Sequence, residues 1–305
     1  MRFRTCCCAF AKQGRQAGFG WSAYLMQRVV VSFAIVKYKN INMQFANLNG
    51  STIHYKFLPG LTPVDDAMSF MFINSLGTDY RIWNDVAAEL RYYGNILLFD
   101  NRGHGLSDTV DDANGINDYA DDAMALLEHL SINQCIPIGL SVGGLVAQIM
   151  AVHIPKKIRK LILCDTRHKI GNAQIWNDRI SSVKKEGLRS ISDGVMQRWF
   201  SEKFRSENAA TVAGYKNMLE RTPPLGYIKT CEAIRDADLT EIAKQIKIPS
   251  LCIAGSEDKS TTPGEVKNLA DLIKGSKFEV IEGSGHIPCV DNPELLTKLI
   301  IDFIK

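Results

Sequence analysis

The stretch Ile136–Ala151, with the sequence IPIGLSVGGLVAQIMA, places one serine among three glycines between two apolar segments. Residues 135–140 form a run of strand length, and the residues after Ser141 repeat apolar side chains at helical spacing. Gly139, Ser141 and Gly143 match G-x-S-x-G, a pattern that a chain of 305 residues contains by chance about one time in ten. The strand before the serine and the helix after it are the context that a nucleophilic serine on a sharp turn requires. Ser141 is therefore the candidate nucleophile.

The same alternation of strand and helix continues on both sides of this stretch. Strands are predicted over 43–48, 52–58, 67–74, 95–100, 135–140, 158–165, 249–258 and within 277–286, and helices over 79–94, 117–130, 143–154 and 294–304. Strands separated by helices predict parallel β-α-β units, so the expected class is an α/β fold whose mostly parallel sheet is covered by helices. The alternation stops at about 166–238, and we interpret this insertion as a helical lid over the carboxyl edge of the sheet.

The first residues differ in composition from the rest. Residues 1–43 hold seven Lys or Arg residues and no acid. An Arg-rich targeting segment is one interpretation. A natural translation start at Met43 is the interpretation we favour, because the residues that follow it read as a first β-hairpin. We therefore predict an extension over 1–42 and one α/β domain over 43–305.

The composition excludes several classes of protein. No run of 18 or more uncharged apolar residues occurs in the 305-residue sequence, so no membrane-spanning helix and no membrane partner are expected. The eight cysteines do not form a disulfide framework, which favours free thiols in a reducing cytoplasm. No C-x-x-C pair or histidine cluster indicates a metal, and no nucleic-acid partner or cofactor is expected. The sequence is compatible with a monomer and leaves the oligomeric state open.

Charge is unevenly distributed along the chain. Residues 165–235 hold thirteen basic and eight acidic residues, a net charge of +5, whereas the other residues after position 43 carry a net charge of −9. A basic segment beside an acidic body suggests a small anionic substrate. The alternative is a solvated helical surface that binds nothing.

Two further polar residues follow predicted strands in the way that Ser141 does. Asp258 ends the run 249–258, and His286 lies in a glycine-rich loop after a predicted strand. A serine hydroxyl needs a base within hydrogen-bond reach and an acid that orients that base. His286 is the expected base and Asp258 the expected acid, and the chain order Ser, Asp, His is that of α/β hydrolases.

An acyl-transfer site also needs donors for the oxyanion. The backbone N–H of Val142 is the first candidate, since it lies at the start of a helix where N–H groups have no partner within the helix. The loop after strand 67–74 supplies the second, and Leu76 is its best-placed residue. Ser75 in the same loop is a candidate substrate contact. A plain connecting loop is the alternative.

These residues carry a resemblance to a known family. The segments FINSLGTDYRIW, LLFDNRGHGLSD, IGLSVGGLVAQ, IAGSEDKSTTP and GSGHIPCVDNPE are similar to those of the α/β-hydrolase superfamily. Within it, the predicted lid (CDTRHKIGNAQIWNDRISSVKKEGLRSISDGVMQRWF and LERTPPLGYIKTCEAIRDADL) resembles that of 3-oxoadipate enol-lactonases. The resemblance covers about residues 43–305. Val142 departs from the pattern, which would have methionine there, and still supplies a backbone donor.

The resemblance implies an activity. It is the hydrolysis of 3-oxoadipate enol-lactone to 3-oxoadipate, in the β-ketoadipate pathway of aromatic-compound catabolism, through an acyl-enzyme on Ser141 and without a cofactor or metal. The substrate carries a carboxylate, for which a bidentate arginine is the best partner. Arg167, Arg179 and Arg198 are the candidates in the basic insertion, and Trp176 and Trp199 could form walls of the pocket.

Other functions fit the same residues. A carboxylesterase or a carbon–carbon bond hydrolase acting on a small anionic substrate would use the same three catalytic residues. A ligand-binding receptor on the same fold is the alternative that is not an enzyme.

Overall fold

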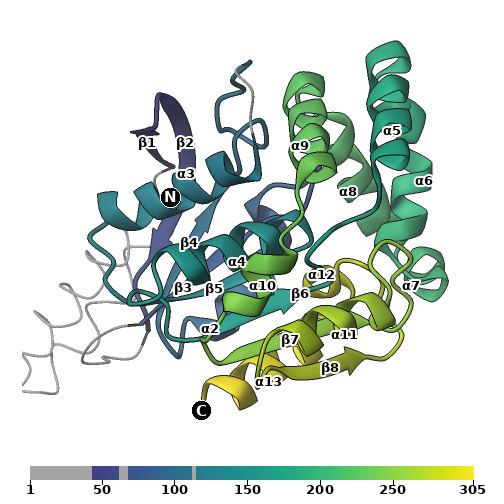
Figure 1. The fold of residues 1–305 in the computed structure, drawn as a ribbon. Coiled ribbons are helices and arrows are strands. Elements are labelled where there is room, and N and C mark those ends of the chain that lie inside the picture. Colours follow the sequence, from purple (N-terminus) through teal and green to yellow (C-terminus); the bar gives the residue numbers. More distant parts are fainter. Residues whose placement is uncertain (1–42, 62–67, 112–114) are drawn as a thin grey trace, which may run out of the picture. The chain divides into compact units, whose positions relative to one another are not determined.

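The computed structural model describes residues 43–61, 68–111 and 115–305, which are coloured in Figure 1. The prediction for residues 1–42 lies outside the described residues. In the described part, eight strands form one sheet in the order β1-β2-β4-β3-β5-β6-β7-β8. The strands are β1 (Gln44–Leu48), β2 (Ser51–Leu58), β3 (Ser69–Ile73), β4 (Asn95–Phe99), β5 (Cys135–Leu140), β6 (Leu161–Cys164), β7 (Ser250–Gly255) and β8 (Lys277–Ile281).

Most neighbouring strands of the sheet run parallel. The hairpin strands β1 and β2 and the pair β2–β4 are antiparallel, and every other neighbouring pair is parallel. Every residue of β3, β5, β6 and β7 is buried, as expected for parallel strands with helices on both faces. The edge strand β8 instead alternates exposed and half-buried side chains and ends on the buried Ile281. The predicted α/β class with a mostly parallel sheet is confirmed.

Helices cover the sheet in two groups that their contacts define. α2 (Asn84–Leu90) packs with α13 (Pro293–Ile304), and the short α12 (Pro288–Asp291) joins them. The second group is a chain of contacting helices: α3 (Ile116–His129), α4 (Val142–His153), α10 (Thr240–Gln245) and α11 (Pro263–Leu272). No helix in the described ranges is long and apolar enough to cross a membrane.

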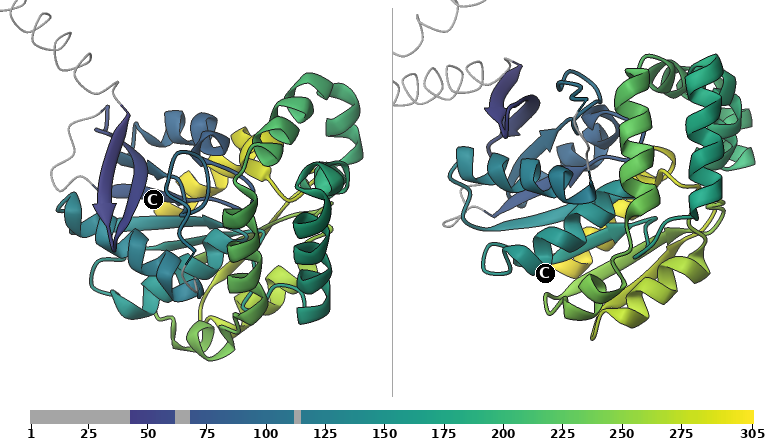
Figure 2. Two further views of the ribbon diagram at one scale, coloured as in Figure 1. Left: turned by 90° about the horizontal axis from the view of Figure 1, so that it is seen from above. Right: turned by 45° about the horizontal axis from the view of Figure 1, so that its top comes forward.

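Five more helices lie between β6 and α10, in the insertion. They are α5 (Ala173–Glu186), α6 (Arg189–Trp199), α7 (Glu202–Glu207), α8 (Ala209–Glu220) and α9 (Pro224–Asp236), counted within the described residues. The two views of Figure 2 show these green helices gathered beside the sheet. We refer to residues 166–238 as the helical insertion.

The helix predicted over 79–94 is divided in the structure. Tyr80–Trp83 form a 3-10 helix (η1), and the α-helical part is Asn84–Leu90. Two carboxylates hold the first turn, because Asp79 accepts a hydrogen bond from the N–H of Arg81 at 3.0 Å and Asp100 accepts one from the N–H of Tyr80 at 2.9 Å. These bonds replace the usual α-helical start and account for the difference.

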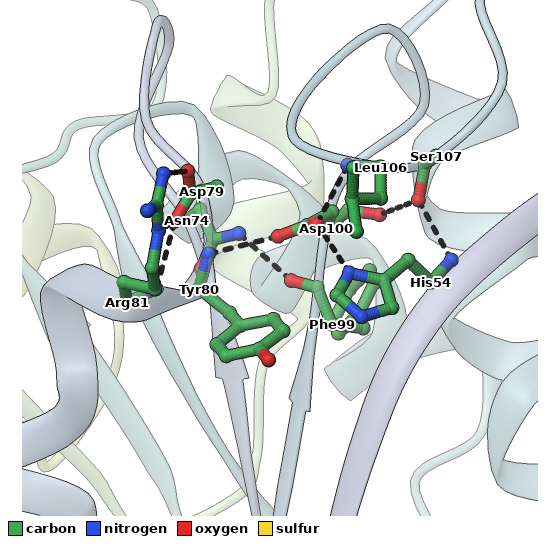
Figure 3. Close-up of polar contacts among 9 residues, drawn as sticks. All are labelled: His54, Asn74, Asp79, Tyr80, Arg81, Phe99, Asp100, Leu106 and Ser107. Carbon is green, nitrogen blue, oxygen red and sulfur yellow. Dashed lines mark hydrogen bonds and ion pairs between the residues drawn. The ribbon is translucent and has the colours of Figure 1, made fainter. Parts of the chain in front are cut away.

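Asp100 is the centre of a buried cluster that joins this turn to the sheet (Figure 3). Its side chain also accepts from the N–H of Leu106 at 3.0 Å and contacts Nδ1 of His54 at 2.7 Å. Asn74, which follows β3, donates to the carbonyl of Phe99 at 2.7 Å. The cluster therefore fixes the loop after β3, which bears the expected oxyanion donor.

Candidate active site

Ser141 lies on a strained turn between β5 and α4. Its backbone has φ 56° and ψ −116°, a conformation that non-glycine residues rarely adopt. Its N–H donates to the carbonyl of Cys164 at 3.0 Å, and its own carbonyl accepts from the hydroxyl of Thr166 at 2.6 Å. The end of β6 thus holds the turn from both sides, and the side chain stands at the carboxyl edge of the sheet.

The glycines around Ser141 are required by close backbone contacts. A Cβ on Gly139 would lie 2.3 Å from the carbonyl oxygen of Gly143, and a Cβ on Gly143 would lie 2.2 Å from that of Ile73. Both distances are far below a carbon–oxygen contact, so no larger residue fits without displacing backbone. The G-x-S-x-G pattern therefore has a steric reason at this turn.

His286 and Asp258 form a buried pair beside it. His286 follows β8, and its Nδ1 contacts Oδ2 of Asp258 at 2.8 Å. Asp258 follows β7 and also accepts from the N–H of Ser260 at 2.7 Å and from the hydroxyl of Thr261 at 2.7 Å. Burial alone would raise the pKa of Asp258, but its attraction to His286 and these hydrogen bonds lower the pKa below its ordinary value. The lowered pKa keeps the carboxylate of Asp258 ionised, and its contact with Nδ1 orients the imidazole ring of His286.

The backbone of His286 is held in place as well. The N–H of His286 donates to the carbonyl of Trp199 at 2.8 Å, at the end of α6. Gly285 permits this approach, because a Cβ there would lie 2.5 Å from the same carbonyl oxygen. A hydrogen bond therefore connects the helical insertion to His286.

One cavity of about 290 Å³ brings most of the predicted residues together. Ser141 and His286 line it with Ser75 and Leu76 from the loop after β3. The helical insertion contributes four predicted residues: Trp176, Arg179, Arg198 and Trp199. The volume of this cavity is at the lower end of the range for ligand pockets, which suits a small substrate.

The structure also places residues in this lining to which the sequence analysis gave no role. They are Ile170, Gly171, Ile175, Val195, Tyr227, Ile234, Lys259 and Ser260. Most lie on helices of the insertion, whose inward faces depend on how α5, α6 and α9 pack. Lys259 and Ser260 directly follow Asp258, so adjacency to a predicted catalytic residue is the one signal that could have found them.

The cavity is positively charged without internal compensation. In the described ranges, no carboxylate forms an ion pair with Arg179 or Arg198. Arg179 lies over the ring of Trp176 at 5.3 Å and donates a long bond of 3.5 Å to the hydroxyl of Tyr227. Burial, and then repulsion by Arg179, lowers the pKa of Arg198 from its ordinary value. Arg179 and Arg198 share this small cavity with Lys259, and such a cationic lining favours a ligand with negative charge.

Arg167 lies elsewhere. It is not among the side chains that line the cavity, and its guanidinium forms an ion pair with Glu265 of α11. Its position shortly after β6 directs it toward the helices that cover the sheet. Of the three candidate arginines, the structure brings only Arg179 and Arg198 to the cavity that holds Ser141.

The expected oxyanion donors have suitable surroundings. Val142 is the first residue of α4, so its N–H has no acceptor within the helix. Leu76 lines the cavity, and its loop is fixed by a hydrogen bond of 2.9 Å from the N–H of Gly77 to Nε2 of His104. Gly77 has φ +78°, which lets the chain turn away directly after Leu76.

Asp165 is a buried acid that the sequence analysis left without a role. It follows β6, is 0% exposed, and lies beside the pair Asp258–His286: the ligand atoms of Asp165, Asp258 and His286 are all within 4.8 Å of one another. Such atoms can bind a metal ion, but the oxygens of Asp258 already accept bonds from Ser260, Thr261 and His286. This donor set therefore fits a hydrogen-bonded relay better than a metal site.

Comparison with known proteins places these features in a wider group. A sequence model of the α/β hydrolase fold matches residues 70–293. The chain is 35% identical to 3-oxoadipate enol-lactonase 2 of Acinetobacter baylyi, over 79% of this chain and 90% of that protein. It is 30% identical to 3-oxoadipate enol-lactonase 1 of the same organism, over 87% of this chain and 97% of that protein. The crystal structure of the enol-lactonase from Burkholderia xenovorans superposes with a TM-score of 0.82 at 31% identity, covering 86% and 99% of the two chains.

Proposed function

Because the chain belongs to the α/β-hydrolase family, we propose that it hydrolyses 3-oxoadipate enol-lactone to 3-oxoadipate, as a step in the breakdown of aromatic compounds. Ser141, His286 and Asp258 perform the acyl transfer in this proposal. The observation that carries the choice of substrate is the pair Arg179 and Arg198, which face the small cavity without an acidic partner among the described residues. The names of the similar enol-lactonases support the same substrate class.

The first half of the reaction opens the lactone. The hydroxyl oxygen of Ser141 attacks the lactone carbonyl while His286 accepts the hydroxyl proton, and Asp258 stabilises the imidazolium that forms. The N–H groups of Val142 and Leu76 stabilise the oxyanion. The carbon–oxygen bond of the ring then breaks, and the enolate oxygen takes the proton from His286. The enol becomes a ketone, so the ring-opened product is a poor nucleophile for the reverse reaction.

The second half releases the acyl group. His286 removes a proton from a water molecule, whose oxygen attacks the ester carbonyl on Ser141. The tetrahedral intermediate collapses with cleavage of the bond to Ser141, and the serine oxygen regains its proton from His286. The products are the free enzyme and the dicarboxylate. Arg179 and Arg198 hold the carboxylate that does not react, which orients the lactone carbonyl above Ser141.

Turnover of freshly generated enol-lactone, measured beside p-nitrophenyl acetate, tests this function. We expect rapid loss of the lactone, slow cleavage of the acetate, and a loss of at least about 10⁴-fold in kcat in Ser141→Ala. Ser182→Ala changes an exposed serine of α5 and serves as the control with full activity. Fast ester cleavage with an untouched lactone would contradict the substrate and leave a general carboxylesterase. Full turnover in Ser141→Ala would contradict the nucleophile.

A further inference from the structure

Asp165 lies in a position where a second charge would be costly. Its carboxyl group is fully buried, and its ligand atom lies within 4.8 Å of those of Asp258 and His286. One oxygen, Oδ1, accepts a hydrogen bond of 2.7 Å from the N–H of Gly255. For the other, Oδ2, no donor is found among the described residues. Two carboxyl groups this close do not both ionise, so one of them retains a proton.

The hydrogen-bond partners determine which group retains it. Asp258 accepts bonds from the N–H of Ser260, from the N–H and hydroxyl of Thr261, and from His286, all of which favour its charged form. Asp165 accepts one backbone bond and has its second oxygen free of donors. The proton therefore belongs on Asp165. Burial, followed by the nearby charge of Asp258, raises the pKa of Asp165 well above its ordinary value.

We propose that Asp165 is a positioning residue that stays protonated and donates a hydrogen bond to the carboxylate of Asp258, so that a fourth residue supports the Ser141–His286–Asp258 relay. The proposal rests on the proposed catalytic role of these three residues. Donation from Oδ2 gives that oxygen the partner it otherwise lacks.

The other titratable groups around Asp165 are compatible with a neutral carboxyl. Burial raises the pKa of the Cys164 and Cys289 thiols well above the ordinary value, so both are uncharged. Asp291 of α12 accepts from the N–H of Gly285 at 2.7 Å and from the hydroxyl of Ser284, and burial raises its pKa to about 6. In the described residues, no lysine or arginine forms an ion pair with Asp165. Within the described part of the chain, the N–H of Gly255 is the one donor to its carboxyl group.

The backbone of Asp165 determines which variants are informative. Its φ is 45°, in the left-handed region, which asparagine and glycine tolerate better than other residues. Asp165→Asn keeps both bonds of the protonated acid, since its amide oxygen can accept from Gly255 and its NH₂ can donate to Asp258. Asp165→Gly removes the donor while keeping the turn. Comparing the two variants therefore separates the loss of the hydrogen bond from the loss of a negative charge at position 165.

The first test is the pH dependence of kcat/KM for an ester that the wild type cleaves, with Asp258→Asn as reference. We expect Asp165→Asn to keep kcat and the acid limb of the profile. Asp165→Gly should lower kcat roughly tenfold, the effect of one hydrogen bond to a charged group, and move the acid limb to higher pH. The acid limb moves because Asp258 without the hydrogen bond from residue 165 is a stronger base. It then attracts the protonated imidazole more strongly, which makes His286 more basic. KM should change little in either variant.

Other results would overturn the proposal. A loss in Asp165→Asn as large as in Asp258→Asn, or an acid limb moved to lower pH, would mean that Asp165 is itself ionised beside His286. Wild-type behaviour of Asp165→Gly would mean that Asp165 positions nothing. If p-nitrophenyl acetate is cleaved and the enol-lactone is not, the proposed substrate fails while this test still applies.

The second test does not depend on turnover. Unfolded Asp165 releases its proton above about pH 4, whereas the folded protein retains it, so the wild type loses stability relative to Asp165→Asn as pH rises from 4 to 7. Denaturant unfolding at several pH values measures this difference. A difference that stays constant over that range would show that Asp165 is ionised in the folded protein and would overturn the proposal.

Discussion

At the scale of single residues, the turn at Ser141 and the acidic residues after β6 and β7 determine the geometry of the candidate site. Ser141 could be predicted because its turn needs glycines at fixed neighbouring positions, and His286 because it follows a strand in a glycine-rich loop. Asp165 could not, since its role depends on the side-by-side arrangement of β6 and β7. An acid at the end of a buried strand is common, and the sequence does not show that a second acid lies next to it.

The glycine at the start of α4 gives a prediction at the same scale. Gly143→Ala puts a Cβ 2.2 Å from the carbonyl oxygen of Ile73, so we expect a loss of roughly 1–3 kcal/mol in the free energy of unfolding. Gly264→Ala is the matched control, because Gly264 is likewise the second residue of its helix, α11, and has nothing within 4 Å of an added Cβ. The control should be neutral or slightly stabilised.

Denaturant unfolding of both variants measures the two values. Equal stability of the two alanine variants would contradict the steric account of the turn. Hydrolytic activity should fall with Gly143→Ala and stay unchanged with Gly264→Ala, because only the first displaces the backbone next to Ser141.

At the scale of elements, the helical insertion supplies the arginines and tryptophans that line the cavity. α5 carries Trp176 and Arg179 one turn apart, and α6 ends with Arg198 and Trp199. The basic composition of the insertion could be read from the sequence, but the choice among its arginines could not. Arg167 pairs with Glu265 of α11, a contact between residues 98 positions apart that only the folded chain brings together.

Arg198 gives the prediction that belongs to this element. Arg198→Met should raise KM for the enol-lactone about 10-fold or more, since a hydrogen bond between charged groups contributes roughly 1.5–3 kcal/mol. The carboxylate it holds is remote from the reacting carbonyl, so kcat should change less than KM. Cleavage of p-nitrophenyl acetate, which has no carboxylate, should be unaffected.

Arg189→Met is the matched control for this experiment. Arg189 begins the same helix, its side chain is 87% exposed, and it pairs with Glu220 away from the cavity. Its loss should leave both substrates unaffected. Equal changes in KM for lactone and acetate in Arg198→Met would indicate a damaged cavity and contradict a carboxylate site at Arg198.

At the scale of the whole molecule, the alternation of strands and helices predicted the fold class and the edge of the sheet that bears the site. It did not predict the order of the strands, in which β4 lies between β2 and β3. Nor did it predict the division of the helix over 79–94, which depends on Asp100 at the end of a distant strand. Both results come from contacts between segments far apart in the chain, which periodicity does not encode.

The central claim concerns the fit between a cationic cavity and an anionic lactone, and one pair of substrates tests it directly. The measurement is kcat/KM for ring opening of 3-oxoadipate enol-lactone and of its methyl ester, which keeps the lactone and lacks the charge. The account predicts that the wild type prefers the anionic lactone by about 10- to 100-fold, the contribution of a charge-assisted hydrogen bond. Equal values, or a preference for the methyl ester, would contradict it.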